Sequence, residues 1–196
     1  MPHDLTFRFL RPEDAGRLAD FFKAIPEATR RVYGPHHFDE VTAEARCRAQ
    51  VTDDDLSIIA VNESGEVLAY CVYRRGFCPS DLERNGYHVR AYDADDVVTV
   101  APCVKEGIRG GGMGGMLLRF AAYEARREGR KALVLFGGVR SGNIRALKTY
   151  LSVGFRFLGF WEHPNCPANY DMACDLVRPG KDNATGADSH ARKTSG

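Results

Sequence analysis

Seven consecutive residues combine the types and spacing needed to bind an anion through the backbone. Arg109 is followed by five glycines and one methionine over residues 110–115, and a helical pattern begins within this run. The first N–H groups of a helix lack intrahelical partners, and the helix dipole favours negative charge beside them. Glycine lets a phosphate approach the backbone, and Arg109 adds a positive charge. The segment predicts a phosphate site, with a glycine-rich turn as the alternative.

Three phosphate-binding designs compete for this segment. A nucleotide P-loop ends in Gly-Lys-Ser/Thr, but Gly115 is followed here by Met116-Leu117, which excludes it. Gly110-x-Gly112-x-x-Gly115 matches a dinucleotide fingerprint literally. However, eight residues, 102–109, separate it from the preceding strand, and no acid follows the next strand for a ribose. We interpret that match as accidental, which leaves the third design.

The third design depends on two motifs in a fixed order. Arg109-x-x-Gly112-x-Gly114 opens one helix. The second motif covers another helix that runs into a strand, and it reads Asn143-x-x-Ala146-x-x-x-Tyr150-x-x-x-Gly154-Phe155. Together they resemble the pyrophosphate loop and the second signature of the GNAT superfamily of N-acetyltransferases. The resemblance covers roughly residues 5–177; it is specific for fold and cofactor and says little about the substrate.

The resemblance implies that acetyl-CoA lies in a gap between two splayed parallel strands, here 97–101 and 132–136. Backbone groups around Val98, Val100 and Ala101 would align the thioester and polarise its carbonyl. Asn143 would cap its helix and is a candidate cofactor contact. Residues 103–108 lengthen the approach to the loop relative to the family, which leaves the backbone contacts open. The pyrophosphate would meet Arg109, Gly110, Gly111, Gly112, Met113, Gly114 and Gly115.

The resemblance also assigns a general acid. Tyr150 would protonate the departing thiolate while a neutral amine attacks the thioester directly. Without Asn143 and Gly154-Phe155 around it, the same tyrosine would be interpreted as a packing residue. The acidic run 93–96 could instead hold a cationic amine. The base stays unassigned among His88, Asp93, Asp95, Asp96 and Glu106.

These residues require a particular α/β scaffold. The resemblance implies a mixed, mostly antiparallel central sheet with helices on both faces and a splayed parallel strand pair holding the cofactor. Hydrophobic periodicity predicts helices opening at Pro12, over 42–50, from the glycine segment to about Gly129, and over 143–153. Pro102 is expected to end the central strand. The predicted strands are 5–10, 56–61, 67–73 (a hairpin with the one before), 97–101, 132–136, 155–161 and 170–177.

Length and charge bound the remaining choices. We expect one domain over 1–178 and a disordered tail over 179–196, which is polar and lacks periodicity. With 27 Lys+Arg against 26 Asp+Glu, the chain offers no general electrostatic case for nucleic acid or a membrane surface. It shows neither a long apolar run nor a secretory layout, so a cytoplasmic location is expected.

The cysteines and histidines favour no metal. Six cysteines include no C-x-x-C pair, and the histidines lack metal-ligand spacing. Cys71 and Cys174 are expected to be buried thiols in strands, whereas Cys78 and Cys103 are expected in loops.

The sequence therefore predicts transfer of an acetyl group from acetyl-CoA to a primary amine of a small molecule or peptide, by direct attack in a ternary complex. Residues 33–38 and 77–96 are expected to shape the acceptor pocket. A homodimer is among the expected assemblies, because dimers are common among relatives of this kind. The alternative is a non-catalytic acyl-CoA-binding or sensing domain on the same fold, with a nicotinamide-dependent oxidoreductase third.

Overall fold

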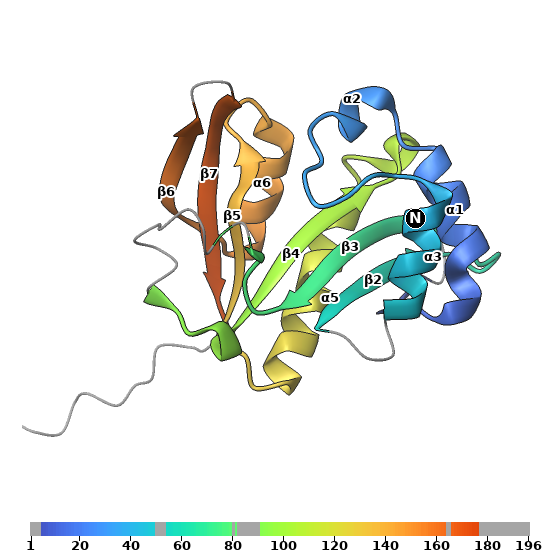
Figure 1. Ribbon diagram of the computed structural model, residues 1–196, viewed down its shortest axis with the longest axis horizontal. Coiled ribbons are helices and arrows are strands. Elements are labelled where there is room, and N and C mark those ends of the chain that lie inside the picture. The colour runs from blue at the N-terminus through green and yellow to red at the C-terminus, as the bar shows by residue number, and fades with distance from the viewer. Residues whose placement is uncertain (1–4, 50–53, 80, 82–90, 164–165, 177–196) are drawn as a thin grey trace, which may run out of the picture.

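The fold is built on a single seven-stranded sheet in the order β1-β2-β3-β4-β5-β7-β6 (Figure 1). The computed structural model describes residues 5–49, 54–79, 81, 91–163 and 166–176. Every neighbouring pair of strands is antiparallel except β4 and β5, which confirms the predicted mixed sheet. The strands are β1 (Thr6–Phe9), β2 (Asp55–Val61), β3 (Val67–Arg75), β4 (Val97–Val104), β5 (Ala132–Arg140), β6 (Arg156–His163) and β7 (Cys166–Asp175).

Helices cover both faces of the sheet. On one face α5 and α6 share a core cluster with β2, β3 and β4, and on the other face α1 and α3 bury a second cluster. None of the described helices is both long and apolar enough to cross a membrane. The helices are α1 (Ala15–Lys23), α2 (Glu27–Arg30), α3 (Glu40–Ala49), α5 (Met113–Arg127) and α6 (Ile144–Val153), with 3-10 turns η1 (Pro12–Asp14), η3 (Ala94–Asp96) and η4 (Glu106–Ile108).

The two-sided cover explains the near-continuous apolar runs of the central strands. Residues 67–73 of β3 are all buried, because a strand covered by helices on both faces has no solvent side on which to alternate. The predicted β2–β3 hairpin is confirmed, and its turn is closed by the Gly65 N–H, which donates to the Asn62 carbonyl at 2.8 Å.

Several predicted boundaries are wrong in ways that matter for the site. β4 does not end at Pro102 but continues to Val104, and β5 runs to Arg140 instead of ending near residue 136. Cys103, predicted in a loop, is therefore a buried residue of β4. Cys71 and Cys174 are buried as expected.

The predicted helices agree with the structure in part. The first helix opens with a 3-10 turn, the second begins at Glu40 rather than residue 42, and the single turn α2 was not predicted. Asn143 caps the last helix as expected. The proposed tail, 179–196, lies outside the described residues.

Candidate active site

The parallel strands β4 and β5 pair only at their beginnings. Their register joins Val97 through Thr99 to the segment 132–134, and beyond it the two strands share no pairing although both are fully described. Figure 1 shows the consequence: the upper end of β5 stays with β7 while β4 leans toward β3. A V-shaped gap between the C-terminal halves of the two strands results, as the resemblance implied.

The alternation of the β3–β4 ladder determines which backbone groups face this gap. Gly76 N–H donates to the Val97 carbonyl and Lys105 N–H to the Leu68 carbonyl, both at 2.9 Å, at the two ends of the ladder. Because hydrogen-bonded pairs alternate in an antiparallel ladder, the odd-numbered residues of β4 bond to β3. The even-numbered residues point their N–H and C=O groups toward β5.

This alternation separates the three predicted backbone positions. Val98 is even-numbered but lies where β4 still pairs with β5, opposite Leu133, and Ala101 is odd-numbered and pairs with Val72. Val100 is even-numbered and follows the last paired residue of β4, Thr99. Its N–H therefore points toward Val134, the last paired residue of β5, and its carbonyl faces the gap. Pro102 has no N–H to offer, but at this gap-facing position none is needed for the ladder, which explains why the strand continues through it.

A bulge bends β5 away from β4. The β5–β7 register is irregular between Leu135 and Val139, and Gly137 in this stretch has φ +58°. The Gly137 N–H donates to the carboxylate of Asp171 on β7, which is buried. Bulges of this kind increase local strand twist and bending, so β5 diverges immediately after its last pair with β4.

The glycine segment forms the opening of α5. Gly112 is the N-cap residue with φ +82°, and the intrahelical ladder begins with Met116 N–H donating to Gly112 C=O at 3.0 Å. The N–H groups of Met113, Gly114 and Gly115 precede that ladder and have no intrahelical acceptor. A Cβ built on Gly114 would lie 3.4 Å from Thr149 of α6 and 3.6 Å from Val104 of β4. The helix opening therefore lies beside the end of β4.

Arg109 is held by protein groups. Its Nε donates to the Val104 carbonyl at 3.1 Å, one terminal nitrogen donates to Thr29 Oγ1 at 2.8 Å, and the other lies 3.6 Å from Glu106. Its backbone N–H donates to the Glu106 carbonyl at 3.1 Å. Residues 103–108, expected as a long approach, are instead the last two residues of β4, the linking Lys105 and the compact η4. Arg109 follows η4 directly.

Tyr150 is buried on α6, with 6% of its surface exposed. Burial raises the pKa of its hydroxyl above the ordinary value, and the thiols of Cys71 and Cys103 nearby raise it further. Its ring packs edge-on against Phe155 with centroids 5.2 Å apart, and it shares the α5-side core with Val100. Its hydroxyl forms no hydrogen bond to any described residue, and its raised pKa favours the protonated form.

The other predicted residues lie in surface contacts. Asn143 is exposed and its side chain accepts from Ala146 N–H at 3.2 Å, which is a helix cap. Asp96 is ion-paired with Lys131 at 2.7 Å, at the N-terminal end of β4, where the strands are still paired. His88 lies outside the described residues.

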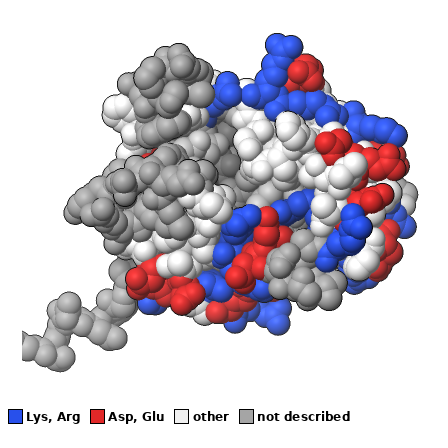
Figure 2. Space-filling view, viewed as in Figure 1, with Lys and Arg blue, Asp and Glu red and all other residues white. Residues whose placement is uncertain are grey.

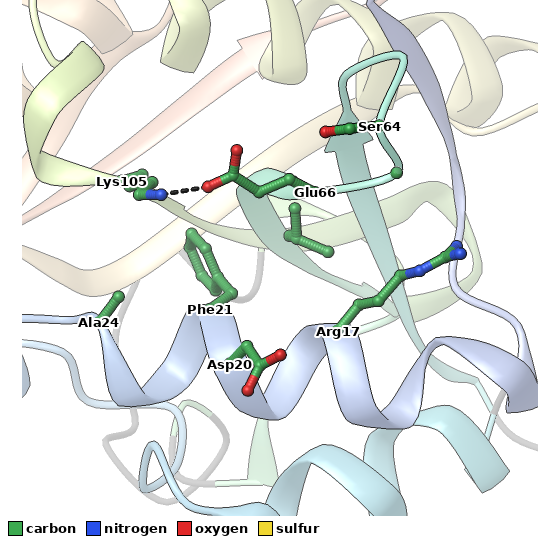
Figure 3. Close-up of a pocket in the computed structure, with 9 residues that line it drawn as sticks. Arg17, Asp20, Phe21, Ala24, Ser64, Glu66 and Lys105 are labelled. Carbon is green, nitrogen blue, oxygen red and sulfur yellow. Dashed lines mark hydrogen bonds and ion pairs between the residues drawn. The ribbon is translucent and has the colours of Figure 1, made fainter.

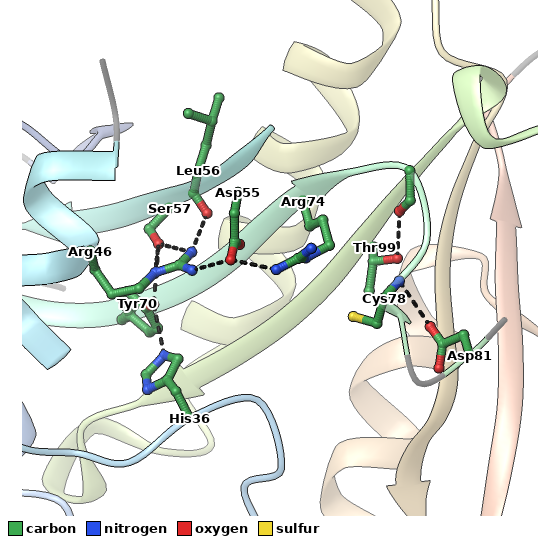
Figure 4. Close-up of polar contacts among 11 residues, drawn as sticks. His36, Arg46, Asp55, Leu56, Ser57, Tyr70, Arg74, Cys78, Asp81 and Thr99 are labelled. Atoms are coloured by element: carbon green, nitrogen blue, oxygen red, sulfur yellow. Dashed lines mark hydrogen bonds and ion pairs between the residues drawn. The ribbon is translucent and has the colours of Figure 1, made fainter. Parts of the chain in front are cut away.

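A buried polar network lies on the opposite face, under α3 (Figure 4). Arg46 donates to Ser57 Oγ and to the Leu56 carbonyl, both at 2.6 Å, and Ser57 Oγ lies 3.1 Å from the Tyr70 hydroxyl. His36 Nε2 lies 2.9 Å from the same hydroxyl, and burial lowers the pKa of this histidine. The network fixes the loop that carries His36 onto β3.

A surface hollow between α1 and the β2–β3 turn is also polar (Figure 3). Opposite charges in this hollow neutralise one another, because Lys105 is ion-paired with Glu66 across it. No group of three or more His, Cys, Asp or Glu side chains suited to a metal occurs within the described ranges.

Some contacts around the gap were missed from the sequence. Thr29 accepts from Arg109, Tyr33 donates to Ala101 of β4, and Arg140 donates to Arg31 beside α2. These partners lie 68 to 109 positions apart in the chain. No local sequence signal could have joined them.

Comparisons with known proteins agree with this geometry. A sequence model described as the acetyltransferase (GNAT) family matches residues 18–155. A search of curated protein sequences gave no match.

Solved structures share the fold across most of the chain. An acetyltransferase of the GNAT family from Streptococcus pneumoniae aligns with a TM-score of 0.67 at 18% identity, covering 89% of this chain and 100% of that one. Salmonella typhimurium yncA, solved with its cofactor acetyl-CoA, gives 0.65 at 19% identity over 93% and 99%. AAC(6')-Ib in complex with parmomycin and acetyl-CoA gives 0.64 at 16% identity over 93% and 100%. At these identities the alignments establish a common fold.

Proposed function

Since this chain belongs to the acetyltransferase (GNAT) family, we propose that it transfers an acetyl group from acetyl-CoA to a primary amine of a small molecule or peptide. The observation that carries this function is the juxtaposition of two features. The glycine-capped opening of α5 lies beside Val104, at the end of the strand that borders the gap. An anion at the helix opening would therefore be continuous with a chain lying along β4.

The cofactor's two ends require different groups, and the described residues supply both. The free amides of Met113, Gly114 and Gly115 suit the pyrophosphate, because they are oriented donors at a positive helix end. The Val100 carbonyl, which faces the gap beyond the last paired residues of β4 and β5, suits an amide N–H of the pantetheine arm. Arg109 contributes positive charge at this end, although its described hydrogen bonds go to protein atoms.

The chemistry follows from the protonation state of Tyr150. Acetyl-CoA supplies an acetyl thioester; the amine nitrogen forms a bond to the carbonyl carbon and the carbon–sulfur bond breaks. The departing thiolate takes a proton from the Tyr150 hydroxyl, which its raised pKa keeps protonated before the reaction, and solvent returns a proton to the tyrosine afterwards. The ammonium proton of the amine leaves to a base or to solvent.

The acceptor class is the least constrained part. The formal net charge of +1 favours neither cationic nor anionic amines. An aminoglycoside is bound by AAC(6')-Ib, a relative of the same fold, so aminoglycosides belong in any amine panel beside amino acids, polyamines and peptides.

Two glycines at the ends of α5 provide a matched test. Gly112 has φ +82° and Gly129 has φ +77°, and a Cβ on either would meet nothing within 4 Å. Gly112→Ala and Gly129→Ala should therefore cost similar backbone strain, about 1–2 kcal/mol each. Only the first alters the amides that face the phosphates.

We expect calorimetry to show CoA binding to the wild type, weakened about tenfold by Gly112→Ala and unchanged by Gly129→Ala, since one charge-assisted hydrogen bond is worth about this much. A thiol-release assay with acetyl-CoA and the amine panel should then reveal turnover. No binding by the wild type, or equal weakening by both variants, would overturn the cofactor assignment. Binding without turnover on any amine would favour a sensing domain.

A further inference from the structure

The segment 26–33, which we call the strap, cannot hold its shape alone. Its helix α2 is a single turn of four residues, far below the length at which a helix is stable in water. Arg30 ties it to the preceding and following chain by donating to the carbonyls of Ile25 at 2.8 Å and Phe38 at 2.6 Å, and also to that of Phe22. Its conformation is therefore set by side-chain contacts.

Two contacts tie the strap to the β4 arm of the gap. The Arg109 guanidinium donates to Thr29 Oγ1 at 2.8 Å while its Nε holds the Val104 carbonyl at 3.1 Å. The Tyr33 hydroxyl donates to the Ala101 carbonyl at 3.0 Å. The strap thus follows the C-terminal half of β4, the half that has left β5.

A third contact ties the strap to the β5 arm. Arg140, the last residue of β5, donates to the Arg31 carbonyl at 3.0 Å. In Figure 1 α2 lies above the upper end of β4, and the chain that follows it descends on the side that faces β5. Lys and Arg side chains line this upper edge in Figure 2. The strap therefore bridges the open end of the gap.

The strap and α5 lie on opposite faces of the sheet. Tyr33 and Ala101 pack against the core cluster of α1 and α3, whereas α5 and Tyr150 belong to the cluster on the other face. If the phosphates of the cofactor lie at the opening of α5, the amine must approach the thioester from the face that the strap covers.

We propose that Arg109 and Arg140 are positioning residues that hold the strap across the acceptor entrance, so that it limits access of water and amine to the thioester. This inference rests on the proposed function for the identity of the thioester. The contacts that tether the strap do not depend on the proposed function. In this arrangement the Arg109 side chain holds the strap in place on the acceptor side of the gap. The backbone amides of the glycine segment bind the phosphates.

The tether is tested first without any ligand. Thr29→Val removes the hydroxyl that accepts from Arg109 at nearly constant shape, while Thr29→Ser keeps it. Limited trypsin digestion reports strap opening through cleavage after Arg30 or Arg31. We expect Thr29→Val to speed that cleavage about tenfold, the loss of one hydrogen bond to a charged group, and Thr29→Ser to leave it near wild type. Equal rates in all three proteins would overturn the tether.

Arg140→Met tests the other arm, with Arg127→Met as its control, because Arg127 is an exposed residue at the far end of α5. Each strap variant is then assayed for CoA affinity by calorimetry and for acetyl-CoA hydrolysis without an amine. We expect faster hydrolysis by several-fold and a raised KM for any amine acceptor, with CoA affinity within twofold of wild type.

The outcomes separate the two ideas. Faster digestion with unchanged hydrolysis and unchanged acceptor KM would overturn the positioning role and leave the proposed function standing. A loss of CoA affinity matching the loss for Gly112→Ala would also overturn it, because the strap would then belong to the cofactor side. Absence of CoA binding by the wild type would defeat the proposed function, while the digestion rates would still decide the tether.

Discussion

Removing the hydroxyl of Tyr150 should separate catalysis from stability unusually cleanly. In most buried tyrosines the hydroxyl has a protein partner, so Tyr→Phe leaves a second polar group unsatisfied. Among the described residues, no hydrogen bond to the Tyr150 hydroxyl occurs, and the side chain is 6% exposed. Tyr150→Phe therefore leaves no described partner atom without a hydrogen bond, and the ring keeps its edge-on contact with Phe155.

Tyr150→Phe should have a large effect on the rate of catalysis and a small effect on stability. Loss of a positioned general acid costs typically 10²–10⁴ in rate, so kcat should fall by at least about a hundredfold. The free energy of unfolding should change by less than about 1 kcal/mol, or about 2–4 °C in Tm for a domain of this size. The affinity for CoA should stay within twofold, because the proposed phosphate contacts are backbone amides of the α5 opening and do not include the Tyr150 hydroxyl.

The pH dependence gives a second readout. Because burial raises the pKa of the Tyr150 hydroxyl, the acid form persists through the alkaline range. The wild-type rate should rise with pH as the amine deprotonates and show no falling limb from Tyr150 below about pH 10, the ordinary tyrosine pKa.

The assay is thiol release under saturating acetyl-CoA, with Tyr123→Phe, an exposed tyrosine on α5, as the control. A Tyr150→Phe variant that retains kcat within twofold would refute the acid role. A variant that loses CoA binding or several kcal/mol of stability would show that the residue is structural instead.

Two further predictions concern stability. Asn143→Ala removes the α6 cap and should cost about 1 kcal/mol in thermal unfolding while leaving CoA affinity unchanged; a parallel fall in affinity would restore the predicted cofactor contact. Burial alone raises the pKa of Asp14, but hydrogen bonds from Arg8 at 2.8 Å and from the Arg11 N–H at 2.8 Å bring it below the ordinary value. That stabilisation is present above about pH 4, the unfolded pKa, and lost as pH falls through the lower folded pKa. Asp14→Asn, costing about 3 kcal/mol at pH 7, should flatten this acid limb in urea titrations; an unchanged limb would contradict the assignment.

The glycine segment and the α6 motif were predictable because their signals are local. Glycine at 112 marks a positive-φ helix cap, and Asn143 precedes an amphipathic helix. The strap was not predictable, because the contacts that shape it join residues far apart in the sequence. Four residues of α2 are too few to show a helical period, and Arg109 meets Thr29 across 80 positions of chain. A basic residue before a glycine loop suggested a phosphate ligand, whereas its described contacts are with protein.

The gap between β4 and β5 depends on features that sequence rules would count as defects of a strand. Pro102 in a strand normally costs a ladder hydrogen bond, but at an even-numbered position of β4 its missing N–H faces away from β3. Gly137 and its neighbour Gly138 weaken β5 as a strand, yet the positive φ at Gly137 allows the bulge, in which the Asp171 carboxylate accepts from the Gly137 N–H. The Val100 carbonyl thus faces the gap where proline on one strand and glycine on the other interrupt regular pairing, and a ligand with its own amide group can extend the ladder there.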